Sequence, residues 1–286
     1  MVRTGIQTFE VSIVKVLDLF AGIGGFTIGL ERAGFETAAF CEIDPYAQKV
    51  LRKNWPGVPI YDDVRAITAE RLASDGIGVD VITGGFPCQD ISVSGNQAGI
   101  QDGTRSGLWS ECARLIGELR PRYAIFENVT NLLNGERGAW FKRVLWDISQ
   151  IGYDAEWHCI PASELGAHHH RDRIWIIAYP SGEHGRNNTQ LATDQAERSQ
   201  SAINLATICA DVADTNSAQR KRGSLSFGIQ SQYTNIVGAS GWGAEPDVGR
   251  VADGIPSRSH RLKCLGNAVV PPIPELIGRA IAHHER

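Results

Sequence analysis

Apolar residues recur along the first two thirds of the chain in short runs, each followed by a turn or by a helical pattern. The runs are rich in β-branched and aromatic residues, which is typical of strands buried in a parallel sheet. Alternation of such strands with helices predicts an α/β fold in which helices cover both faces of the sheet. The runs are residues 13–20, 37–41, 79–83, 123–126, 157–160 and 174–177.

Helical periodicity occupies the intervals between these runs. Phe26, Leu30 and Ala33 recur on one face before Gly34, which is typical of a helix end. Asp44 followed by Pro45 predicts a helix N-terminus, because aspartate caps the first turn and proline suits its first position. Further helices are expected at residues 108–119, 140–152 and 273–281.

The regular pattern is interrupted near Pro180. Residues 181–261 are rich in Ser, Asn, Gln, Thr and Gly, whereas residues 265–272 regain apolar character before the last helix. We therefore expect a first domain at 12–180, a small second domain or insertion at 181–262, and a segment at 263–286 that returns to the first domain.

Length, charge and cysteine spacing narrow the class of protein. A chain of 286 residues can bury a full core, and a net charge of −4 excludes a bulk polycation. No apolar run approaches the roughly 18 residues that span a bilayer. The six cysteines are scattered without a Cys-x-x-Cys pair, which favours a reducing cytoplasm over a disulfide framework or a zinc site.

A glycine-rich turn follows the first strand and opens the first helix, so that backbone N–H groups can approach a ligand. Glu42 ends the second strand, twenty residues after Gly22, where an acid commonly binds ribose hydroxyls. The glycines do not form Gly-x-Gly-x-x-Gly, and no basic residue is placed to meet a pyrophosphate. A nucleoside without phosphates fits this pattern better than a dinucleotide.

Cys88 is the candidate nucleophile. It follows a buried strand, the Gly84–Gly85 turn and Pro87, an arrangement that favours display of the thiol over burial as a small hydrophobic side chain. Glu127 ends a later strand at the same edge of the predicted sheet, where a buried carboxylate needs a partner. Arg171 and Arg173 open the strand at 174–177 and can pair with it.

Three consecutive histidines, His168, His169 and His170, suggest a metal site. Neighbouring side chains in an extended segment point to opposite faces, so the three cannot easily converge on one ion. We therefore expect no metal.

Six motifs, taken in order, resemble those of the DNA cytosine-5 methyltransferases. The resemblance covers residues 13–179 and 263–284. The motifs are Asp-Leu-Phe-Ala-Gly-Ile-Gly-Gly at 18–25, Glu-Ile-Asp at 42–44, Gly-Phe-Pro-Cys-Gln at 85–89, Glu-Asn-Val at 127–129, Arg-Asp-Arg at 171–173 and Gly-Asn-Ala-Val-Val-Pro at 266–271.

The resemblance implies a doubly wound, Rossmann-like sheet of the S-adenosylmethionine-dependent type, with residues 181–262 as a target-recognition domain. S-adenosylmethionine is then the expected cofactor, with Glu42 on its ribose, Ile43 against its adenine and Asp63 accepting from the adenine amino group. The other residues expected around it are Phe20, Ala21, Gly22, Gly24, Gly25, Val64, Pro87, Leu108, Asn267 and Ala268.

The same resemblance implies roles in catalysis and DNA binding. Cys88 would add to C6 of a flipped-out cytosine, Glu127 would bond N3 and the exocyclic amine, and Arg173, supported by Arg171, would contact O2. The loop at 92–105 would close on the DNA. The expected DNA contacts are Gln89, Ser92, Ser94, Arg105, Arg220, Lys221 and Arg222.

Two positions depart from the family pattern: His169 replaces a glutamine, and residues 250–256 are at most a degenerate form of one motif. The expected partner is double-stranded DNA, with a monomeric enzyme and no membrane. A cognate restriction endonuclease in the same system, a phage and an orphan system all stay open. Two alternatives stay open, namely a tRNA cytosine-5 methyltransferase and a catalytically silent DNA-binding relative.

Overall fold

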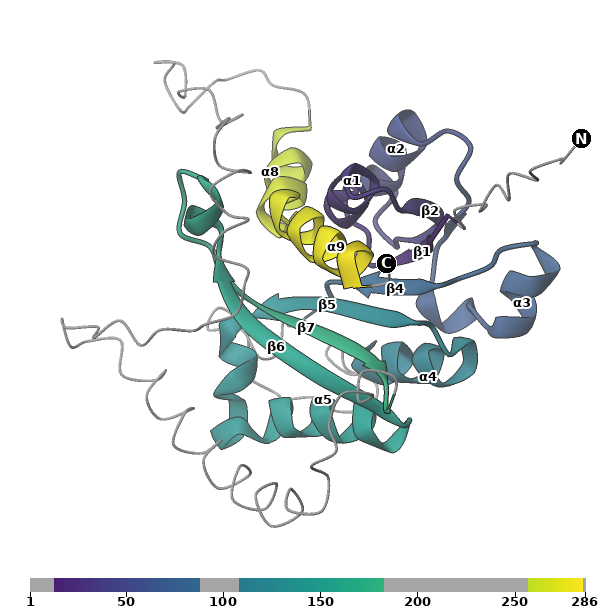
Figure 1. The fold of residues 1–286 in the computed structure, drawn as a ribbon. Coiled ribbons are helices and arrows are strands. Elements are labelled where there is room, and N and C mark those ends of the chain that lie inside the picture. Colours follow the sequence, from purple (N-terminus) through teal and green to yellow (C-terminus); the bar gives the residue numbers. More distant parts are fainter. Residues whose placement is uncertain (1–12, 88–107, 183–256, 285–286) are drawn as a thin grey trace, which may run out of the picture.

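The computed structural model describes residues 13–87, 108–182 and 257–284, apart from the side chain of Arg258. Within them, strands and helices alternate as the hydrophobic pattern predicts (Figure 1). The strands are β1 (Lys15–Leu19), β2 (Glu36–Cys41), β3 (Ile60–Tyr61), β4 (Val81–Gly84), β5 (Tyr123–Val129), β6 (Tyr153–Pro161) and β7 (Asp172–Pro180). The α-helices are α1 (Gly25–Arg32), α2 (Pro45–Asn54), α3 (Ala69–Ser74), α4 (Trp109–Leu119), α5 (Ala139–Gln150), α8 (Arg258–Asn267) and α9 (Pro272–His284).

The described strands form one sheet in the order β3-β2-β1-β4-β5-β7-β6. Strands β1 to β5 run parallel to one another, whereas β7 runs antiparallel between β5 and β6. The chain first builds outward from β1 through β2 to β3 and then crosses back to β4 on the other side. Because the connections diverge there, the carboxyl ends of β1 and β4 mark the place where ligands bind in open α/β sheets.

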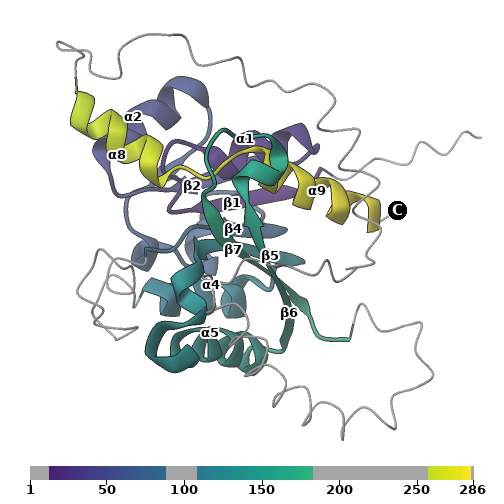
Figure 2. The same ribbon diagram turned by 90° about the vertical axis from the view of Figure 1, so that its left-hand side faces the viewer.

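Helices cover both faces of the sheet (Figure 2). Leu17 and Ile82 pack on the side of α4 and α5, whereas Val16 and Val81 pack on the side of α1 and α9. Successive strand residues point to opposite faces, so one run supplies both cores. Near the C-terminal end, Ile273, Leu276 and Ile277 of α9 pack in the core that contains Phe26 and Leu30 of α1.

Local signals account for the helix ends. Asp44 accepts from the N–H groups of Tyr46 and Ala47 at 2.8 and 3.4 Å, which satisfies donors that the first turn of α2 leaves unpaired. Helix α4 ends at Arg120, which has a left-handed backbone (φ 49°) just before Pro121.

Candidate active site

A cavity of about 690 Å³ opens at the carboxyl ends of the parallel strands. The residues after β1, β2, β4 and β5 converge there, together with the start of β7 and the end of α8. Of the predicted site residues, its walls contain Phe20, Gly22, Glu42, Ile43, Asp63, Val64, Pro87, Leu108, Glu127, Arg171, Arg173 and Asn267.

Glu42 is buried at one end of the cavity, with 8% of its surface exposed. Its Oε2 accepts from the N–H of Gly22 at 2.6 Å, and its Oε1 accepts from the N–H of Asp44 at 2.7 Å. A carboxylate offers about four acceptor positions, so each oxygen keeps capacity for a further donor. Two backbone contacts therefore hold the carboxylate of Glu42 in place and leave acceptor positions for a ligand.

Asp63 lies beside Glu42 in the wall of the cavity, where the chain leaves β3. Its Oδ1 accepts from the N–H of Arg65 at 3.0 Å and so caps the short 3₁₀ turn Val64–Ala66. Asp62 turns the other way and accepts from Gln48 Nε2 at 2.9 Å, and the same amide donates to the carbonyl of Glu42 at 2.6 Å. Of the two acids in this turn, Asp63 is the one that lines the cavity.

The glycine turn after β1 has two structural purposes. A Cβ on Gly24, whose φ is +87°, would lie 2.6 Å from the Trp55 ring, and one on Gly25 would lie 2.5 Å from the carbonyl oxygen of Val269. These two glycines thus allow α1 to approach its neighbours closely. Gly22 has open space around it and contributes its N–H to Glu42.

Glu127 is buried at the other end of the cavity, at 8% exposure. It lies opposite Trp175 in the antiparallel β5–β7 pair, so Arg173 is its diagonal neighbour on the same face. The predicted pairing is confirmed, with Arg173 Nε 2.9 Å from Glu127 Oε1. Burial raises the pKa of Glu127 above its usual range, and the nearby arginines Arg173 and Arg171 oppose that rise.

Arg171 contacts a different part of the chain. Its guanidinium donates to the carbonyl of Gly266 at 2.7 Å and to that of Ala268 at 2.8 Å, across 95 and 97 residues of sequence. It therefore ties the start of β7 to the turn that carries Asn267. Burial lowers the pKa of Arg171, as does its neighbour Arg173.

Some predicted site residues lie elsewhere. Ala21, Gly24, Gly25 and Ala268 are near the cavity in sequence but are not among the residues that line it. Eight others fall outside the described residues, as does almost all of the predicted recognition domain. They are Cys88, Gln89, Ser92, Ser94, Arg105, Arg220, Lys221 and Arg222.

Sequence reasoning missed the part of the wall that α8 contributes. Lys263 and Cys264 line the cavity, and so do Asp44 and Arg65. Helix α8 buries none of its described side chains, so it has no apolar period that would have predicted it. Only the short Gly-Asn motif marked this region.

No group of three His, Cys, Asp or Glu side chains that could hold a metal ion occurs in the three described ranges. Nor does any helix in them have the length and apolar character needed to cross a membrane.

The chain is similar in sequence to curated proteins named Type II methyltransferases. The Type II methyltransferase M2.BsuMI of Bacillus subtilis is 39% identical over 169 residues, which are 58% of this chain and 42% of that protein. M1.ScrFI of Lactococcus lactis subsp. cremoris is 29% identical over 242 residues, 79% of this chain and 61% of the relative. The chain thus spans less than two thirds of the length of these curated relatives.

Solved structures show the same fold. A protein described as a DNA modification methyltransferase encoded within an E. coli prophage matches with a TM-score of 0.51 and 30% identity, over 58% of this chain and 47% of that one. Spodoptera frugiperda DNMT2, at 20% identity, shares the fold with a TM-score of 0.50, over 59% and 51% of the two chains.

The family comparison covers the largest part of the chain. Residues 14–244 match the family model described as C-5 cytosine-specific DNA methylase, and this span includes β1 to β7 and most of the cavity wall. The chain belongs to the C-5 cytosine-specific DNA methylases.

Proposed function

We propose that this chain transfers a methyl group from S-adenosylmethionine to C5 of a cytosine in double-stranded DNA. The proposal rests on one observation: a single cavity joins an acid held by backbone N–H groups, Glu42, to an acid held by an arginine, Glu127. Such a cavity suits a cofactor at one end and a base at the other. Membership of the family supports this assignment.

The Glu42 end fits the cofactor chemically. Glu42 and Asp63 are acceptors, which suit the ribose hydroxyls and the adenine amino group better than they suit phosphates. Ile43 lines the same wall with 73% of its surface exposed, so a flat ring placed over it would bury apolar area. When bound, S-adenosylmethionine supplies an electrophilic methyl group on a sulfonium sulfur.

The Glu127 end fits the base. An acid with a raised pKa holds its proton closer to neutral pH, so Glu127 can donate to N3 of cytosine while Arg173 keeps its carboxyl group in place. Arg173 has donors left for the O2 oxygen, because a guanidinium carries five N–H groups. Arg171 supports the pair through its charge and through its contacts with Gly266 and Ala268.

We assign the nucleophile to Cys88, the residue that follows Pro87 in the cavity wall. Its thiolate adds to C6, N3 takes a proton from Glu127, and C5 becomes electron-rich enough to accept the methyl group. Loss of the C5 proton to water then expels the thiolate, and the proton on N3 returns to Glu127. The net products are 5-methylcytosine, S-adenosylhomocysteine and one proton. A stacked base cannot reach such a cavity, so the cytosine must leave the helix, which costs a few kcal/mol.

The proposal also covers DNA recognition, the oligomeric state and the cellular setting of the enzyme. Residues 181–262 select the DNA sequence, with Arg220, Lys221 and Arg222 on phosphates, and the loop at 92–105 closes on the duplex. The enzyme acts as a monomer in the cytoplasm, and a pair with a cognate restriction endonuclease, a phage and an orphan system are the alternatives for its setting.

Bisulfite sequencing of DNA from cells that express the protein will identify the methylated sites. A duplex with 5-fluorocytosine at such a site is then incubated with the protein and S-adenosylmethionine. Fluorine cannot leave C5 as a proton does, so elimination stalls with the base bonded to Cys88. We expect an adduct that resists denaturation and requires S-adenosylmethionine.

Cys88→Ser should abolish this adduct, because an alcohol is far less ionised than a thiol near neutral pH. Cys159→Ser is the matched control, since Cys159 is an exposed free thiol on β6, and this variant should still form the adduct. An adduct mapped to another cysteine, or normal methylation by Cys88→Ser, refutes the mechanism. Preferential methylation of tRNA over duplex DNA would replace the proposed substrate.

A further inference from the structure

Helix α8 forms one wall of the cavity although, among the described residues, no hydrophobic core holds it. Lys263, Cys264 and Asn267 line the cavity, whereas Leu262 and Leu265 are 58% and 63% exposed. Cys264 is half-buried, and the other described side chains of the helix are exposed. Burial of apolar surface therefore contributes little to holding α8 in place.

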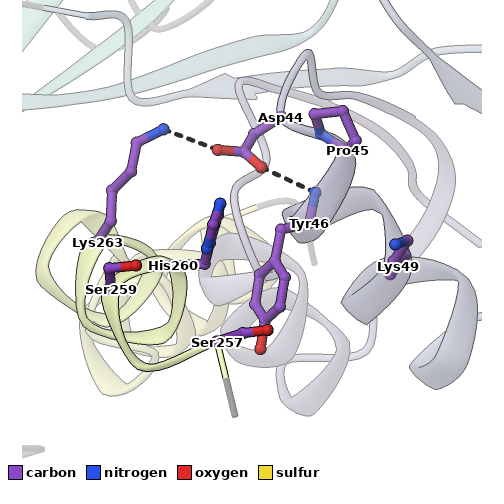
Figure 3. Close-up of a pocket in the computed structure, with 8 residues that line it drawn as sticks. All are labelled: Asp44, Pro45, Tyr46, Lys49, Ser257, Ser259, His260 and Lys263. Carbon is purple, nitrogen blue, oxygen red and sulfur yellow. Dashed lines mark hydrogen bonds and ion pairs between the residues drawn. The ribbon is translucent and has the colours of Figure 1, made fainter.

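Polar contacts attach α8 instead. Lys263 Nζ lies 2.8 Å from Asp44 Oδ2, at the N-terminus of α2. The His260 ring rests against the Tyr46 ring, with centroids 5.5 Å apart and planes tilted by 32°. At the far end of the helix, Arg171 donates to Gly266 and Ala268. Two of these contacts bridge α8 and α2 (Figure 3).

Asp44 connects this bridge to the cofactor end of the cavity. Figure 3 shows its carboxylate between Lys263 and the N–H of Tyr46, so one oxygen pairs with the lysine and the other caps α2. The backbone N–H of Asp44 donates to Glu42 at 2.7 Å. Lys263 is thus connected through Asp44 to Glu42, the acid proposed to hold the ribose.

We propose that Lys263 is a positioning residue: paired with Asp44, it holds α8 against α2, fixes one wall of the cofactor cavity and slows release of the cofactor. This inference rests on the proposed function, because it takes the cavity to be the site of S-adenosylmethionine. The hydrogen bond from Lys263 lowers the pKa of Asp44, so the pair is ionised at neutral pH.

The pair is open to solvent, with the lysine side chain 60% and the aspartate side chain 21% exposed. Measured pairs of this kind correspond to equilibrium changes of about two- to fivefold, and salt screens them. Loss of the pair should therefore loosen α8 by that factor without unfolding the protein.

Two readouts test the role of Lys263. Hydrogen–deuterium exchange of residues 258–267 in cofactor-free protein measures opening of α8. Displacement of S-adenosylhomocysteine in a stopped-flow instrument measures release from the cavity. We expect Lys263→Ala to raise both rates about two- to fivefold, and Lys263→Arg, which keeps the charge, to restore them.

Asp44→Asn separates the ion pair from the helix cap, because asparagine caps helices as well as aspartate does. It should match Lys263→Ala, and the double variant should be no faster than either single variant. Lys49→Ala is the matched control, since Lys49 lines the adjoining cavity with Asp44 but belongs to α2 and does not bridge to α8. All differences between variants should disappear near 1 M salt.

Unchanged exchange and release in Lys263→Ala, or equal effects in Lys49→Ala, would overturn the inference while leaving the proposed function intact. Failure of the parent protein to bind S-adenosylmethionine or S-adenosylhomocysteine would refute the proposed function, and the cofactor role of Lys263 with it. The exchange of α8, measured without cofactor, distinguishes these two failures.

Discussion

The two ends of the cavity hold glutamates that are equally buried but differently supported. Glu42 is fixed by the backbone N–H groups of Gly22 and Asp44, whose positions are set by the fold of the chain. Glu127 is held by the side chain of Arg173, and burial raises its pKa. Burial favours the protonated form of Glu127, whereas Arg173 opposes that effect and keeps the carboxyl group in place. The first arrangement suits binding and the second suits catalysis.

The largest expected effect is at the catalytic end. Glu127→Gln keeps the size of the side chain but removes the acidic proton that can be transferred to the base, so methyl transfer at saturating cofactor should fall by about 10²–10⁴-fold. Cofactor affinity, measured by calorimetry, should stay within about twofold, because the Glu42 end is untouched. If Glu127→Gln transfers methyl groups at a rate within tenfold of the parent protein, the catalytic role of Glu127 is refuted. The proposed difference between a binding acid and a catalytic acid is then refuted as well.

At the Glu42 end of the cavity we expect a smaller effect, which falls on cofactor binding instead of on methyl transfer. Glu42→Ala removes charge-assisted hydrogen bonds to the cofactor and should weaken its binding by roughly 1.5–3 kcal/mol. DNA affinity and the folded state should be largely preserved. Glu36→Ala is the control, because Glu36 is an exposed residue of β2, the strand that leads to Glu42. Calorimetry showing equal cofactor affinity in both variants would refute the assignment of Glu42.

An effect on stability instead of on activity is expected at a third acid, Asp18, which threonine hydroxyls help to hold. Asp18 is completely buried in β1 and accepts from Thr27 Oγ1 at 3.0 Å and from Thr83 Oγ1 at 2.9 Å. Burial raises its pKa to about 7 from a reference value of 3.8. Between these two values the folded state retains a proton that the unfolded state loses, so the contribution of Asp18 to stability declines as pH rises towards 7.

Asp18→Asn should therefore flatten the pH dependence of the unfolding free energy between about pH 4 and 7, by at most about 1.4 kcal/mol per pH unit. Urea titrations of both proteins at several pH values measure this difference. Asp80→Asn is the control, because Asp80, directly before β4, accepts from the backbone N–H of Lys15 instead of from threonine hydroxyls. A parallel pair of pH curves for Asp18→Asn and the parent would show that Asp18 is ionised in the folded protein.

The sequence alone determined the order of the elements and most of the cavity wall. Runs of β-branched residues predicted the strands, and residues placed directly after parallel strands must meet at one edge of the sheet, whatever the connections between them. Glu42 and Glu127 were found in this way. Helix α3 and strand β3 were missed because six and two residues are too few for a period to appear.

Tertiary structure alone decided the contacts between distant segments. Lys263 and Asp44 are 219 residues apart, and Arg171 meets Gly266 across 95 residues. The antiparallel entry of β7 between β5 and β6 also decided that Arg173, rather than Arg171, is the diagonal neighbour of Glu127. Hydrophobic periodicity reports which face of a segment is buried and not which segment covers it. Helix α8, whose described side chains are all at least partly exposed, therefore became recognisable only in the folded chain.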